Sequence, residues 1–145
     1  MIKISIAAIL FILNLPLLIN SEAPKTILQT PAADLQESIK KGKTVFSTYC
    51  IACHQENGLG MEGVFPPLAK SDYLLADTKR AIKVVMHGMS GEITVNGKKY
   101  NSQMPDFGLN DEQIKDVVNY IQNSWGNKGK AVTLADVKAV RAAKK

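Results

Sequence analysis

The chain has 145 residues, of which 46% are hydrophobic and 21% charged, and its formal net charge is +5. This length suits one ordinary domain and leaves no room for two separate hydrophobic cores. The charge is unevenly distributed, because residues 24–125 are neutral and the whole excess lies beyond Gly126. Because residues 24–125 carry no net charge, nucleic acid is not an expected partner.

Residues 1–23 have the pattern of a signal peptide. A positive residue precedes an apolar run over residues 4–19, which Pro16 interrupts, and small polar residues follow. This pattern predicts export, cleavage after Ser21 or Ala23, and a periplasmic mature protein. An uncleaved membrane anchor is the alternative, because no strong small-x-small cleavage site follows the run.

Residues 24–33 are predicted to be a linker, and residues 34–126 a single domain that begins with a helix over residues 34–54. Gly42 lies on the apolar stripe of this helix, where a glycine costs about 1 kcal/mol relative to alanine. A close approach of another backbone would explain it. The stripe recurs at steps of three and four residues: Leu35, Ile39, Gly42, Phe46, Tyr49 and Cys53.

The first predicted helix ends in a C-x-x-C-H motif, which is the attachment site of c-type haem. The thiols of Cys50 and Cys53 can add across two vinyl groups on one edge of a porphyrin, and His54 can then offer its imidazole to the iron. We therefore expect one haem c, bound covalently through two thioethers.

Two other interpretations of the cysteines remain open. Cys50 and Cys53 could form a disulfide, although redox dithiols usually follow a strand within a βαβ unit. A zinc site would need His54 and His87 as further ligands, and adjacent Cys53 and His54 fit a tetrahedron poorly.

Loop chemistry follows the motif over residues 55–67, which contain three glycines and two prolines. A second helix is predicted over residues 77–88, capped by Asp77 or Thr78. Residues 93–100 contain Asn-Gly and predict a small hairpin.

The second axial ligand of the iron decides whether the site carries electrons or binds small molecules. We expect Met104, which precedes Pro105 in the loop before the last helix. His87 is the alternative, as a bis-histidine ligand. The remaining methionines of the domain are expected to be core fillers: Met61, Met86 and Met89.

A third helix is predicted over residues 110–124, with Asn110 as its cap and Gln113 completing a capping box. Residues 127–145 form a basic extension, in which Thr133 can cap a short helix that docks on the domain. The extension could steer an acidic partner or contact anionic lipid, and a solvated, partly helical tail without a partner is the alternative. Strand signals are almost absent, so the predicted class is all-α.

The sequence resembles the class I cytochrome c family over residues 34–126, through Gly42, Phe46 and the C-x-x-C-H motif. The resemblance implies three main helices around one haem, with Gly42 and Phe46 crossing Val117 and Tyr120. It also implies that the carbonyl of Pro66, or of Pro67 as the alternative, accepts a hydrogen bond from His54 and so tunes its basicity.

A narrower resemblance links residues 100–105 and 111–127 to bacterial haem modules of copper nitrite reductases and periplasmic dehydrogenases. It implies electron transfer with a nitrite reductase, a dehydrogenase or a terminal oxidase, and an electron carrier instead of an enzyme. A five-coordinate haem that binds nitric oxide or peroxide is the alternative function. The expected docking patch surrounds the haem edge: Ile51, Ala52, Met61 and Val64.

Overall fold

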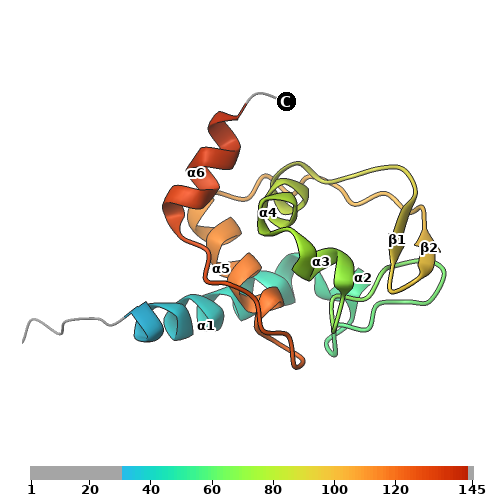
Figure 1. Ribbon diagram of the computed structural model, residues 1–145, viewed down its shortest axis with the longest axis horizontal. Helices are drawn as coiled ribbons and strands as arrows, with labels where there is room; N and C mark the ends of the chain where they lie inside the picture. Colours follow the sequence, from blue (N-terminus) through green and yellow to red (C-terminus); the bar gives the residue numbers. More distant parts are fainter. Residues whose placement is uncertain (1–30, 144–145) are drawn as a thin grey trace, which may run out of the picture.

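The computed structural model of the protein describes residues 31–143 (Figure 1). The predicted signal peptide, residues 1–23, and residues 24–30 of the predicted linker lie outside the described residues. The first helix begins at Pro31, so the last three residues of the predicted linker are helical instead. Proline is tolerated there, because the first turn of a helix leaves its N–H groups without intrahelical partners.

Helices dominate the described residues, which confirms the predicted all-α class. None of these helices is long and apolar enough to cross a bilayer. In chain order the elements are α1 (Pro31–Tyr49), α2 (Ile51–His54), α3 (Asp72–Ala76), α4 (Thr78–His87), β1 (Ile93–Val95), β2 (Lys98–Tyr100), α5 (Asp111–Gln122) and α6 (Leu134–Ala142).

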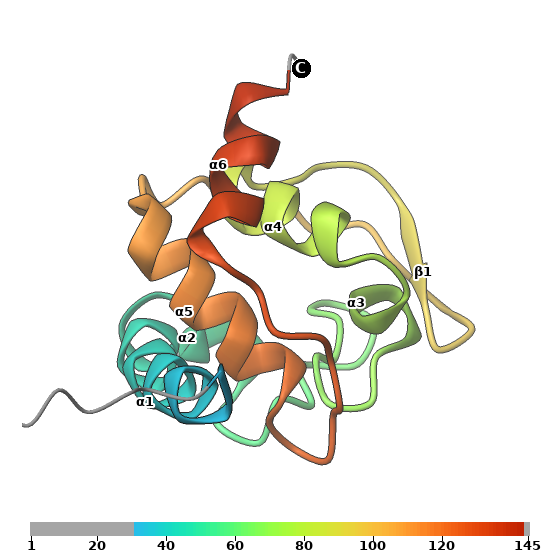
Figure 2. The same cartoon turned by 60° about the vertical axis from the view of Figure 1, so that its left-hand side comes forward.

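The close crossing of α1 and α5 organises the core (Figure 2). A Cβ added at Gly42 would lie 1.9 Å from the carbonyl oxygen of Asp116 and 2.7 Å from the Cβ of Tyr120, so only glycine fits there. One turn later, the rings of Phe46 and Tyr120 lie 5.3 Å apart between centroids. The predicted crossing is therefore confirmed, and Val117 is buried in the same core.

The first predicted helix, over residues 34–54, is divided in two at Cys50. The φ of −117° and ψ of −28° at Cys50 depart from the helical values of about −63° and −42°. The C-x-x-C-H motif therefore ends on a separate single turn, α2, which the periodicity of the apolar residues could not reveal.

Two helices, α3 and α4, and the hairpin follow one another in the chain between α2 and α5. Helix α3 was not predicted, because five residues are too few to show a helical period; Ser71 caps it by accepting a hydrogen bond from the N–H of Leu74 at 3.1 Å. Helix α4 follows with Asp77 as its cap, as predicted. The predicted hairpin is present as β1 and β2, with positive φ angles at Asn96 and Gly97.

The C-terminal extension packs into the same core as the domain. Its helix α6 contacts α4 and α5, and the side chain of Val137 is fully buried. Asn119 of α5 exchanges two hydrogen bonds with the backbone of Val132, at 2.7 and 2.9 Å. Thr133 forms the capping box of α6 with Asp136, so the predicted cap and the predicted docking of this helix are both confirmed.

Candidate functional site

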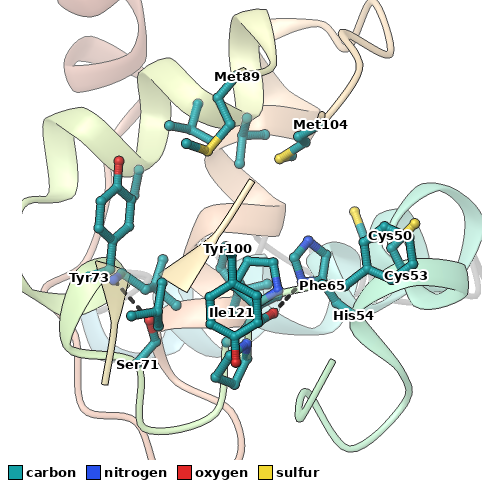
Figure 3. A pocket seen from close by; sticks show the side chains of 18 of the residues that line it. Cys50, Cys53, His54, Phe65, Ser71, Tyr73, Met89, Tyr100, Met104 and Ile121 are labelled. Carbon is teal, nitrogen blue, oxygen red and sulfur yellow. Dashed lines mark hydrogen bonds between the residues drawn. The ribbon is translucent and has the colours of Figure 1, made fainter. Parts of the chain in front are cut away.

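One largely apolar cavity of about 1100 Å³, including its open mouth, lies between α2, the loop after it, α4, the hairpin and the loop before α5 (Figure 3). All five predicted site residues line it: Cys50, Cys53, His54, Pro66 and Met104. The tertiary structure therefore brings together residues that span 55 positions of the chain.

The imidazole of His54 is held by one hydrogen bond. Its Nδ1 lies 3.0 Å from the carbonyl oxygen of Pro66, so the ring donates there and presents Nε2 to the cavity. Burial lowers the pKa of His54, while the hydrogen bond to Pro66 opposes that shift. The imidazole is consequently neutral at pH 7, which is its metal-binding form.

The position of the Pro66 carbonyl depends on Gly60. The N–H of Gly60 donates to the carbonyl oxygen of His54 at 3.0 Å. A Cβ on Gly60 would lie 2.4 Å from the oxygen of Phe65 and 2.7 Å from that of Pro66, and its φ is +63°. Only glycine therefore allows the loop to fold back over His54.

The two cysteine sulfurs border the cavity and form no disulfide with each other. Burial, and the nearby Cys53, raise the pKa of the Cys50 thiol to about 11. Among residues 31–143 no group of three or more His, Cys, Asp or Glu could hold a metal ion, so the zinc alternative is not supported.

Met104 reaches the cavity from the loop before α5, and a short backbone bridge holds it there. Its N–H and carbonyl exchange hydrogen bonds with Met89 at 2.9 and 3.0 Å. Gly88 permits this approach, because a Cβ there would lie 2.3 Å from the Met104 oxygen. His87, the alternative ligand, ends α4 and does not line the cavity.

Met89 is a cavity residue that sequence reasoning missed. It was expected to fill the core, but it lies beside Met104 just after α4 ends at His87, with both thioethers directed into the cavity (Figure 3). Gly88 was expected to end the second helix and does so. No signal in the sequence marks the position of Met89 beside Met104.

The donor set and the walls of the cavity fit a haem. A porphyrin needs apolar contacts on both faces, and the cavity is lined mainly by aliphatic and aromatic side chains. Two thiols lie at one edge, and the imidazole of His54 faces the Met104 side of the cavity (Figure 3). A soft thioether and a neutral imidazole are ligands that haem iron accepts.

Comparison with known proteins gives a consistent picture. A family model described as cytochrome c matches residues 39–125. Cytochrome c-552 of Thermus thermophilus is 43% identical over 105 residues, which cover 66% of this chain and 80% of that protein. The cytochrome c subunit of gluconate 2-dehydrogenase from Pantoea cypripedii is 38% identical over 106 residues, covering 69% of this chain and 24% of the subunit. The cbb3-type oxidase subunit CcoP of Azospirillum brasilense is 32% identical over 95 residues, or 61% and 29% of the two chains.

Proposed function

Because the chain belongs to the cytochrome c family, whose members transfer electrons through a covalently bound haem c, we propose that it is a periplasmic carrier with a six-coordinate haem. Cys50 and Cys53 form the two thioether bonds. His54 and Met104 are the axial ligands. The observation that carries this proposal is the meeting of His54 and Met104, which are 50 residues apart in the chain, in one apolar cavity (Figure 3).

When bound, haem c supplies an iron that alternates between the ferrous and ferric states. The protein holds the two ligands in place so that they need not move between these states. Pro66 fixes the ring of His54 through the 3.0 Å hydrogen bond, and the bridge to Met89 fixes the backbone of Met104. The apolar walls exclude water, which keeps solvent reorganisation small during electron transfer.

The partner is proposed to be a larger redox enzyme that docks beside the motif. Met61 and Val64 of the predicted patch are 48% and 40% exposed, and Ala52 is exposed as well, so the expectation that Met61 fills the core is wrong. Ile51, the fourth member, instead packs partly against the core. An exposed apolar patch of this kind suits the small interfaces of redox encounters.

The names of the relatives support dehydrogenases and a terminal oxidase as the class of partner. A nitrite reductase is proposed on the motif resemblance alone. Contact of the basic extension with a membrane is a further proposal, supported by the charge excess beyond Gly126.

The ligand assignment is tested by visible spectroscopy of Met104→Ala, with Met89→Leu as the matched control. Both methionines line the cavity, but only Met104 is proposed to bind iron. We expect Met104→Ala to keep its covalent haem, lose the weak far-red sulfur-to-iron band, bind carbon monoxide when reduced and have a lower reduction potential. Met89→Leu should keep the band and remain closed to carbon monoxide.

The opposite pattern in the two variants would assign the ligand to Met89. A wild-type protein that binds carbon monoxide readily would favour the five-coordinate alternative, with nitric oxide or peroxide as the ligand.

A further inference from the structure

The segment after α5 holds the loop that carries Pro66. We propose that Trp125 and Asn127 form a clasp that sets the hydrogen bond between Pro66 and His54, and through it the reduction potential. This inference rests on the proposed ligation of the iron by His54. It concerns two positioning residues that line neither the thioether edge nor the axial positions.

Asn127 is the stronger half of the clasp. Its side chain is 6% exposed, and its Oδ1 accepts a hydrogen bond from the N–H of Lys70 at 2.7 Å. Its Nδ2 donates to the carbonyl oxygens of Leu68 at 2.9 Å and Ile121 at 2.7 Å. Both amide hydrogens and the carbonyl oxygen are thus engaged. These three hydrogen bonds join Ile121, in the last turn of α5, to Leu68 and Lys70, which follow Pro66 by two and four residues.

Trp125 holds the other end of the same loop. Its Nε1 donates to the carbonyl oxygen of Glu56 at 2.9 Å, two residues after His54. Its ring covers Gly58, where a Cβ would lie 2.6 Å from the indole. The indole also packs edge-on against the buried Phe46, with centroids 5.3 Å apart. The φ of Trp125 is +54°, an uncommon conformation for a bulky residue, which indicates that these contacts hold it in place.

The loop can pass a displacement at Asn127 or Trp125 on to Pro66, because hydrogen bonds join its two ends. The carbonyl oxygen of Gly58 accepts hydrogen bonds from the N–H groups of Leu68 at 2.8 Å and Ala69 at 2.9 Å. Leu68, which Asn127 also holds, is two residues from Pro66. A displacement of the segment at Leu68 therefore moves the Pro66 carbonyl relative to the ring of His54.

The direction in which the reduction potential shifts distinguishes a role in positioning His54 from a role in packing the core. A weaker hydrogen bond at Nδ1 makes the imidazole less basic and a poorer electron donor, which favours the reduced state and raises the potential. A merely loosened core would admit water to the cavity. Water stabilises the more highly charged oxidised state and would lower the potential.

The experiment measures the midpoint potential of the haem-loaded protein in Asn127→Ala and Trp125→Phe. The first variant removes all three amide hydrogen bonds, and the second removes the indole donor together with the fused ring that lies over Gly58. We expect Asn127→Ala to shift the redox equilibrium about threefold toward the reduced form, or about 28 mV at 59 mV per tenfold change. Trp125→Phe should shift it in the same direction by less.

Asn123→Ala is the matched control, because the side chain of Asn123, the residue after α5, donates at 2.9 Å to the carbonyl oxygen of Asn119 in the last turn of that helix, and among residues 31–143 it bonds to no part of the loop of Pro66. Its potential should equal that of the wild type. A second readout is the nitrogen-15 NMR signal of the His54 Nδ1–H group, which should show a weakened hydrogen bond and faster solvent exchange in both clasp variants.

Unchanged potentials and an unchanged Nδ1–H signal would overturn the inference, and so would a lowered potential. If Asn127→Ala does not fold, Trp125→Phe decides the outcome, since that variant keeps all three hydrogen bonds of Asn127. If the wild type has the spectrum of a His and Met haem but the clasp variants show unchanged or lowered potentials, the clasp alone is overturned. A wild-type spectrum without that signature would overturn the proposed function as well.

Discussion

At the scale of single residues, glycines determine which backbones can meet around the cavity. Gly42 lets α5 cross α1, Gly60 lets the loop fold back to Pro66, and Gly88 lets Met104 approach. None of the three contributes a side chain to the chemistry. Each instead permits a contact that a Cβ would block, which explains why a glycine lies on the apolar stripe of α1.

Gly42→Ala tests this role. The added methyl group would overlap the carbonyl of Asp116, so the two helices must separate, and we expect the free energy of unfolding to fall by about 2–3 kcal/mol. Urea denaturation of the haem-loaded protein measures the change. Ser47→Ala, on the exposed side of the same helix, should leave the stability within about 0.5 kcal/mol of the wild type. Equal stability of Gly42→Ala would show that the crossing is not tight.

The ligands differ in how firmly the chain holds them. The ring of His54 donates a hydrogen bond to a carbonyl whose own position depends on a closed loop and on the clasp. Within residues 31–143, Met104 is held by its backbone bridge to Met89 and not by a hydrogen bond of its side chain. The reduction potential should therefore respond to substitutions well outside the cavity, as the clasp variants test.

At the scale of elements, α6 shows how a basic extension becomes part of the domain. Thr133 and Asp136 form a reciprocal capping box at its first turn, and Val137 fills a fully buried position. At its other end, Arg141 pairs with Asp111 in the first turn of α5 at 2.6 Å. The exposed ion pair contributes little, so the cap and the buried valine hold the helix in place.

The capping box should make this helix sensitive to acid. Hydrogen bonds from Thr133 lower the pKa of Asp136. Because the folded pKa is below the unfolded one, this contribution is complete above the unfolded pKa of about 3.9 and is lost as the pH falls through the folded value. The difference in melting temperature between the wild type and Asp136→Ala should therefore be present at pH 6 to 7, by about 2–4 °C, and shrink below about pH 4. A difference that is independent of pH would contradict this account.

At the scale of the whole molecule, the exposed apolar residues of the 55–67 loop and the basic residues of α6 are separated. Leu59, Met61 and Val64 of this loop are exposed, and so is Phe107, which lines the cavity. Helix α6, with exposed Lys138 and Arg141, lies away from the 55–67 loop in both views (Figures 1 and 2), whereas Lys128 and Lys130 follow Asn127, which contacts Leu68 and Lys70. Electron exchange at the cavity edge should then depend on apolar contact more than on the net charge.

Two substitutions with the same change of charge test this separation. Val64→Asp places a charge that must be desolvated in the apolar patch, at a cost of about 1–3 kcal/mol, so we expect electron transfer to slow about tenfold. Lys138→Ala should change the rate less than about twofold. Stopped-flow oxidation by a cbb3-type oxidase, at equal ionic strength, measures both. A larger effect of Lys138→Ala would place the docking surface on α6.

The sequence by itself determined the haem motif, the helical class, the caps of α4, α5 and α6, and the hairpin. These features depend on neighbours within one or two turns, which spacing and capping residues record directly. The pairing of Gly42 and Phe46 with Tyr120, and of His54 with Pro66, came from a family resemblance instead.

Only the tertiary structure decided that Cys50 ends the first helix, that Met89 lies beside Met104, and that Asn127 and Trp125 hold the loop of Pro66. It also decided that the extension is part of the core. These arrangements depend on contacts between residues far apart in the chain. Such contacts leave no periodic pattern in the sequence, because a single buried amide or a methionine beside a glycine has no spacing that marks its partner.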